Sequence, residues 1–171
     1  KAVTSKTRLR VQIMSDVHIE FRSSEHKFEY KVAAPYLALL GDTGLVNKEA
    51  FGLFVQSAAK QYKAVFLVAG NHEFYHGSIQ RTKELLNELC EKTPNVHFMD
   101  RKSLLVEGVR VLGCTLWTRV PDAHADDVAR VCSDHKVIRM TPGQNAAPFT
   151  VADKTALHDG DVKWLAGELK A

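Results

Sequence analysis

The first half of the chain contains three short motifs whose side chains could bind metal ions or transfer protons. One residue separates Asp16 from His18, Asp42 follows a glycine, and Asn71 and His72 are neighbours in the third motif. Carboxylate, imidazole and amide groups bind divalent metal ions, and a histidine can also move a proton near neutral pH. Each motif alone also fits an ordinary loop or turn. Their occurrence in order is more specific and predicts a shared metal site.

Each motif comes at the end of a short apolar run. The runs at 9–14, 36–41 and 64–69 have the length and composition of buried strands. Ligands of open α/β sheets bind in the crevice at the carboxyl ends of the strands, so we expect the three motifs to converge there. If the segment of Asp16 and His18 is extended, its spacing also points both side chains to the same side.

Helical patterns lie between and after these runs. Residues 47–62 have an amphipathic pattern, with Asn47 as the expected cap. Ser78 is the expected cap of a second helix, which Pro94 would terminate. His26, in the loop after the first run, is a further candidate for contact with a substrate.

The second half of the chain predicts a hairpin and more helix. Two β-rich runs within 103–117 flank Glu107 and Gly108, a sequence typical of a hairpin turn. Residues 121–149 indicate a loop with some helix around 125–132, and a last helix is expected from 151 to 170. The predicted order is β-β-α-β-α-β-β-α, a single α/β domain over residues 1–171.

Composition excludes several classes of protein. The chain has 171 residues, 45% of them hydrophobic, which is enough for one domain with a core. Its 23 basic and 20 acidic residues give a net charge of +3. The basic residues form no stripe of the kind that binds nucleic acids. The three cysteines have no CxxC spacing. The sequence also shows no signal peptide and no apolar run long enough to span a bilayer. These features together predict a cytoplasmic protein.

The third motif can also be interpreted as a zinc-protease sequence. In that interpretation His72 and His76 of H-E-x-x-H bind zinc from one helix, and Glu73 is the base. Glycines before and after the motif favour a loop instead. The extended protease pattern also fails, because Thr82 stands where its third histidine belongs. The protease interpretation therefore stays as a remote alternative.

In these three motifs the chain resembles the calcineurin-like metallophosphoesterase family. The family motifs D-x-H, G-D and G-N-H-[DE] correspond to Asp16-Val17-His18, Gly41-Asp42 and Gly70-Asn71-His72-Glu73. The match spans most of the first half of the chain. The resemblance implies a metallophosphoesterase-type β-sandwich flanked by helices.

The resemblance also implies a binuclear metal site. Asp16 and His18 would bind one metal ion, Asp42 would bridge both ions, and Asn71 would bind the second. His72 would be the catalytic residue that stabilises or protonates the leaving oxygen of a phosphate mono- or diester. The mixture of oxygen and imidazole ligands favours Mn, Fe or Zn. Glu73 and His76 are expected to support the loop.

The chain departs from the family pattern in two places. It lacks the G-D-x-x-D-R motif of protein serine/threonine phosphatases, which removes that subclass and the usual carboxylate partner of the catalytic histidine. It also contains no G-H-x-H motif, which supplies later metal ligands in the family. The chain therefore resembles the N-terminal part of the family domain, truncated at the C-terminal side, with an exposed sheet edge expected.

Two classes of function remain open. The first is a metal-dependent phosphoesterase acting on a phosphorylated substrate, in which the isolated chain has little activity unless a second chain completes the site. The second is a non-catalytic binding or assembly module. The sequence shows no specific nucleic-acid or membrane signature, and the second chain could also cover the sheet edge.

Overall fold

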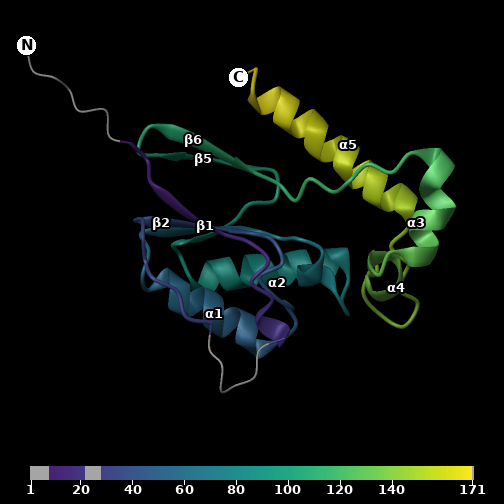
Figure 1. The fold of residues 1–171 in the computed structure, drawn as a ribbon, viewed down its shortest axis with the longest axis horizontal. Helices are drawn as coiled ribbons and strands as arrows, with labels where there is room; N and C mark the ends of the chain where they lie inside the picture. Colours follow the sequence, from purple (N-terminus) through teal and green to yellow (C-terminus); the bar gives the residue numbers. More distant parts are fainter. Residues whose placement is uncertain (1–7, 22–27, 171) are drawn as a thin grey trace, which may run out of the picture.

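The computed structural model describes residues 8–21 and 28–170, and His26 lies outside the described residues. Four parallel strands form the central sheet in the order β1-β2-β3-β4 (Figure 1). The strands are β1 (Val11–Met14), β2 (Tyr36–Leu40), β3 (Ala64–Val68) and β4 (Val96–Phe98). The first three confirm the strands predicted from the apolar runs. The sequence prediction missed β4.

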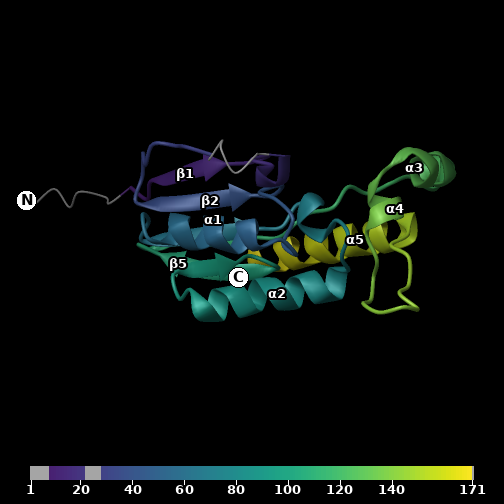
Figure 2. The ribbon, with the colours of Figure 1, turned by 90° about the horizontal axis from the view of Figure 1, so that it is seen from below.

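Two helices cover one face of this sheet. They are α1 (Glu49–Ala59) and α2 (Ile79–Lys92), which run side by side in Figure 2. The Ser78 side chain accepts a hydrogen bond from the Arg81 amide, so the predicted cap of α2 is confirmed. The predicted cap of α1 is wrong, because the N-cap residue is Lys48. The Asn47 amide instead donates to the main-chain oxygens of Tyr75 and His76.

Side chains of the central strands point alternately to the two faces of the sheet, so the core consists of two clusters, one on each face. Leu37 and Leu39 of β2 are fully buried in the cluster that contains the α1 residues Phe51 and Val55. The intervening Ala38 belongs to a second cluster on the opposite face, since successive side chains of a strand point to opposite sides.

A two-stranded antiparallel sheet covers this opposite face. Its strands are β5 (Lys102–Val106) and β6 (Val109–Gly113), and Leu104, Val106 and Val111 pack on the second cluster. Glu107 and Gly108 in the turn both have positive φ, 48° and 79°, as a two-residue hairpin turn requires. The hairpin prediction and the β-sandwich flanked by helices are confirmed.

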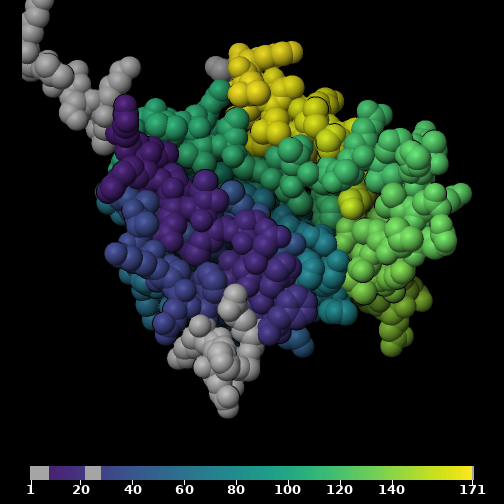
Figure 3. Space-filling model, viewed as in Figure 1, coloured from purple at the N-terminus to yellow at the C-terminus, as the bar shows by residue number. Residues whose placement is uncertain are grey.

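The remaining helices are α3 (Ala125–Val131), α4 (Asp134–Val137) and α5 (Val151–Glu168). The predicted helices around 125–132 and from 151 are confirmed, whereas α4 was not predicted. A capping box between Thr150 and Asp153 starts α5. The ion pair between Arg101 and Asp161 ties α5 to the start of the hairpin, and Figure 3 shows the surface of α5 lying against that of the hairpin.

Short 3₁₀ helices connect several of these elements. They are η1 (Ile19–Phe21), η2 (His72–Phe74) and η3 (Asp122–His124).

Strand β1 lies at an edge of the sheet, and 66% of its Ile13 is exposed. No helix within the described ranges is long and apolar enough to cross a membrane. The single-domain and cytoplasmic assignments stay predictions.

Candidate metal centre

Two glycines bring the ends of β2 and β3 together. A Cβ atom on Gly41 would lie 2.9 Å from the Cα of Gly70, and a Cβ on Gly70 would lie 2.3 Å from Oδ1 of Asp42. Gly41 also has a φ of +88°, which L-residues rarely adopt. Any larger residue at either position would separate the two loops. The glycines of the G-D and G-N-H-E motifs are therefore required for the close approach of the Asp42 carboxylate.

The residues predicted as metal ligands at the ends of β1 and β2 have left-handed backbone conformations. The φ angles of Asp16, His18 and Asp42 are 55°, 48° and 51°. Such conformations cost roughly 1–3 kcal/mol each in a non-glycine residue and cluster at functional sites. The amides of Asp16 and His18 donate to the main-chain oxygens of Gly41 and Asp42, at 3.1 and 3.0 Å, and hold the two loops in register. The segment is not extended, so the expected common direction of Asp16 and His18 does not apply.

Glu73 joins the loops after β2 and β3. Only 1% of this residue is exposed, and its carboxylate accepts hydrogen bonds from the amides of Asp42, Thr43 and Gly70 at 2.9, 2.8 and 2.8 Å. Burial raises the pKa of Glu73 to about 7, against the opposing effect of the hydrogen bonds from Thr43 and Gly70. The prediction that Glu73 supports the loop is confirmed.

This arrangement excludes the zinc-protease alternative. His72 starts a 3₁₀ helix of three residues, and His76 lies beyond its end with a φ of 57°. The two histidines are therefore not one turn apart on a continuous helix. The Glu73 carboxylate is also occupied by three main-chain amides, so it cannot act as the protease base.

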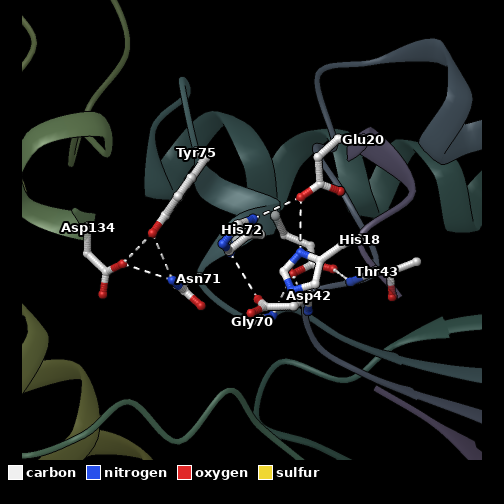
Figure 4. A network of polar contacts seen from close by, with 10 residues as sticks. His18, Glu20, Asp42, Thr43, Gly70, Asn71, His72, Tyr75 and Asp134 are labelled. Carbon is white, nitrogen blue, oxygen red and sulfur yellow. Dashed lines mark hydrogen bonds and ion pairs between the residues drawn. The ribbon is translucent and has the colours of Figure 1, made fainter. Parts of the chain in front are cut away.

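Three side chains meet at the carboxyl end of the parallel sheet. His18, Asp42 and His72 each offer one ligand atom, and these atoms all lie within 4.8 Å of one another (Figure 4). The main-chain amide of His72 donates to Oδ1 of Asp42 at 3.1 Å. The His18 and His72 rings meet edge to face, with their centroids 4.4 Å apart. The expected convergence is confirmed for His18, Asp42 and His72.

Glu20 of η1 orients both imidazole rings, and the sequence prediction did not include it. Its Oε1 lies 2.8 Å from Nδ1 of His72 and 3.1 Å from Nδ1 of His18. Burial tends to raise the pKa of Glu20, but hydrogen bonds from its main chain and the two histidines outweigh this effect and lower the pKa. An ionised carboxylate only accepts hydrogen bonds, so both Nδ1 atoms carry hydrogen, and the Nε2 atom of each ring takes no part in these two contacts.

Glu20 corrects one expectation from the sequence. Loss of the G-D-x-x-D-R motif indicated that His72 lacks a carboxylate partner, but the structure gives it Glu20. The spacing Asp16-x-His18-x-Glu20 is a signal that could have identified this residue. It was missed because the left-handed turn at His18, which the sequence does not reveal, allows Glu20 to reach back.

The other two predicted metal ligands lie differently. Asp16 is exposed and is not part of the three-residue group, and its carboxylate accepts a hydrogen bond from the Ser15 hydroxyl. Asn71 is half-buried, and its Nδ2 donates to Oη of Tyr75 at 3.0 Å and to Oδ1 of Asp134 at 2.9 Å. The metal-binding roles of both residues stay predictions.

The donor set fits a divalent metal ion. His18 and His72 each offer a ring nitrogen, Asp42 adds a carboxylate, and Glu20 accepts from both rings in the way that outer carboxylates orient metal-bound histidines. The second oxygen of Glu20 is buried and has no hydrogen-bond partner among the described residues. Imidazole and carboxylate ligands together suit Mn, Fe or Zn.

Comparison with known proteins identifies the family. The family model described as calcineurin-like phosphoesterase matches residues 9–147, which include all three motifs. The chain belongs to the calcineurin-like phosphoesterase family. Members of this metal-dependent family are hydrolases, in agreement with the donor set at the sheet end.

Two known proteins are similar to this chain. An uncharacterized protein of Acanthamoeba polyphaga mimivirus is 25% identical over 140 residues, which are 79% of this chain and 50% of the relative. The crystal structure of phosphopantetheinyl hydrolase from Mycobacterium tuberculosis superposes with a TM-score of 0.63 at 16% identity, covering 94% of this chain and 62% of that one. The second likeness shows the fold alone. The chain spans half the length of the curated relative.

Proposed function

We propose that the chain carries the metal-binding core of an enzyme that hydrolyses phosphate mono- or diesters. The observation that supports this most directly is the convergence of His18, Asp42 and His72 beside the orienting carboxylate of Glu20. Divalent metal ions bound there would supply a hydroxide nucleophile at neutral pH and neutralise charge on the phosphate. The substrate is a phosphorylated compound whose remaining structure we leave open.

In the proposed binuclear site, Asp16 and His18 would hold one ion, Asp42 would be shared by both ions, and Asn71 would hold the second. The carboxylate of Asp42 suits a bridge because each of its oxygens can bind one ion. Asp16 would have to turn from Ser15 toward His18 when metal binds. The side-chain oxygen of Asn71 accepts no hydrogen bond from the described residues, whereas its nitrogen has two partners.

His72 is proposed to protonate the leaving oxygen of the substrate. Its Nδ1 donates to Glu20, which fixes the ring and leaves Nε2 for a second proton. Because His72 also belongs to the group of residues that could hold a metal ion, a His72→Asn variant separates the two roles. Unchanged metal content with lost turnover supports the acid role, whereas loss of metal assigns His72 as a ligand.

The isolated chain is proposed to turn over little substrate. It contains no G-H-x-H motif, so the imidazoles that this motif supplies in the family must come from another segment or a second chain. A centre short of these ligands binds metal weakly. A second chain could also cover the edge at β1.

Metal analysis combined with hydrolysis of an aryl phosphate monoester and diester by the purified chain tests this function. We expect bound metal and slow metal-dependent hydrolysis, which rises when the missing ligands are supplied. Fast turnover with two ions per chain would contradict the incomplete site. Metal binding without any hydrolysis, even after completion, would favour the binding or assembly module.

A further inference from the structure

The side-chain amide of Asn71 lies in a closed network of polar groups on one side of His72 (Figure 4). Its Nδ2 donates to Oη of Tyr75 and to Oδ1 of Asp134, and the Tyr75 hydroxyl donates to the same oxygen of Asp134 at 3.0 Å. Both hydrogens of the amide nitrogen are therefore used. An asparagine binds metal through its oxygen, so the direction of this amide decides whether Asn71 can be a ligand.

Asp134 can only accept hydrogen bonds in this network. The Nζ of Lys154 in α5 lies 2.9 Å from its second oxygen, and the side chains of Lys154 and Asp134 are 11% and 6% exposed. If the Asn71 amide turned over, its oxygen would face this carboxylate, and two acceptors would meet without a hydrogen. Leaving buried polar groups unpaired in this way costs about 1–3 kcal/mol.

The network is held at both ends by the fold. Main-chain hydrogen bonds connect the loop after η2 to the segment after α4, from the His76 amide to the Val137 oxygen at 3.1 Å and from the Arg139 amide to the Gly77 oxygen at 3.0 Å. Lys154 follows the capping box of α5, and its Nζ lies 5.6 Å from the centre of the Trp117 ring. Asp134 is thus fixed relative to Asn71, although 63 residues separate them in the sequence.

We propose that Asp134 and Lys154 are positioning residues that hold the Asn71 amide with its oxygen turned toward the metal centre. Figure 4 shows that oxygen directed away from Asp134, on the side of Asp42. The ion pair of Asp134 and Lys154 connects α4 and α5 to Asn71 in the loop after β3. This inference rests on the proposed function, because it takes Asn71 as a metal ligand.

Titration of the 171-residue chain with Mn²⁺, followed by the electron paramagnetic resonance signal of the free ion, tests the inference. In Asp134→Asn the remaining oxygen stays with Lys154, so an NH₂ donor faces Nδ2 of Asn71 and favours the turned amide. We therefore expect Mn²⁺ affinity to fall by about 10–100-fold, as for other residues that orient metal ligands. The matched control is Asp161→Asn. Asp161 is a carboxylate of similar burial that binds Arg101 and the Leu116 amide, and its loss should leave Mn²⁺ affinity unchanged.

Testing Asp134→Asn in a chain that also carries Asn71→Asp distinguishes a positioning role of Asp134 from general damage to the fold. In Asn71→Asp, residue 71 becomes a carboxylate facing Asp134, so two acceptors already oppose each other. Adding Asp134→Asn there supplies a donor and should raise Mn²⁺ affinity, the reverse of its effect beside Asn71. General damage would lower affinity in both backgrounds. If Asp134→Asn does not fold, Tyr75→Phe removes the other acceptor of Nδ2 and should give a smaller loss of affinity.

The outcomes distinguish this inference from the proposed function. If the unsubstituted chain binds Mn²⁺ and the folded Asp134→Asn variant binds it equally well, the positioning role is wrong and the metal centre stands. If affinity falls by the same factor in both backgrounds, the pair only stabilises the fold. If the unsubstituted chain binds no Mn²⁺, the inference and the metal centre are both overturned.

Discussion

The Oε1 atom of Glu20 lies 2.8 Å from the Nδ1 atom of His72, and the same oxygen also accepts from His18. One buried carboxylate therefore fixes two rings that come from different loops. Replacing it with alanine frees both rings to rotate and to exchange tautomers. For Glu20→Ala we expect metal affinity to fall by about 10–100-fold, measured by Mn²⁺ titration.

Glu49→Ala is the control for that substitution. Glu49 is an exposed carboxylate in the first turn of α1, so its loss should leave Mn²⁺ affinity unchanged. Equal affinity of the Glu20→Ala variant and the unsubstituted chain would show that Glu20 does not orient the ligands.

Gly70 controls how closely Asp42 approaches the loop after β3. Because a Cβ atom at this position would lie 2.3 Å from Oδ1 of Asp42, Gly70→Ala must displace the carboxylate or the backbone. We expect a loss of about 1–3 kcal/mol in the free energy of unfolding, typical of overpacking. Metal affinity should fall as well. Chemical denaturation and Mn²⁺ titration measure the two effects.

Gly52 provides a matched substitution on α1, where a Cβ would meet nothing within 4 Å. Gly52→Ala should leave metal affinity unchanged and stabilise the helix by up to about 1 kcal/mol, because alanine favours the helix. If Gly70→Ala behaves like Gly52→Ala, the close approach at Gly70 is not required.

The raised pKa of Glu73 predicts that the free energy of unfolding depends on pH. Its pKa is raised in the folded protein from 4.5 to about 7, so its protonated form is favoured by folding. The contribution is fully present below pH 4.5 and is lost as the pH rises toward and through about 7. Relative to Glu73→Gln, the free energy of unfolding of the metal-free chain should fall over this range, by at most about 1.4 kcal/mol per pH unit.

Denaturation of both proteins in the presence of a chelator, at intervals between pH 4 and 8, measures this difference. A difference that rises with pH would mean that the three main-chain hydrogen bonds to Glu73 outweigh its burial. Such a result would not affect the position of Glu73 between the two loops.

The central sheet could be predicted from the sequence because its strands are continuous apolar runs. Val65 and Leu67 of β3 are fully buried, and such runs occur where both faces of a strand are covered. Strand β4 was missed because it has only three residues and carries His97 at its centre. The order of the polar motifs also predicted that His18, Asp42 and His72 would meet.

The residues that orient the site could not be predicted in the same way. Glu20 reaches the histidines through a left-handed turn, which the local sequence does not require. Asp134 comes from a helix of four residues within a region that indicated mostly loop, and its contact with Asn71 depends on tertiary packing alone. Ligand types are visible in short motifs, whereas their orienting partners depend on the whole fold.

The central claim is that this chain binds metal where His18, Asp42 and His72 converge. Mn²⁺ titration of the unsubstituted chain beside Asp42→Asn, which keeps the size of the side chain but removes its charge, tests it most directly. We predict saturable binding of at least one ion to the unsubstituted chain and at least about tenfold weaker binding to the variant. No binding to either protein, or equal binding to both, would contradict the account.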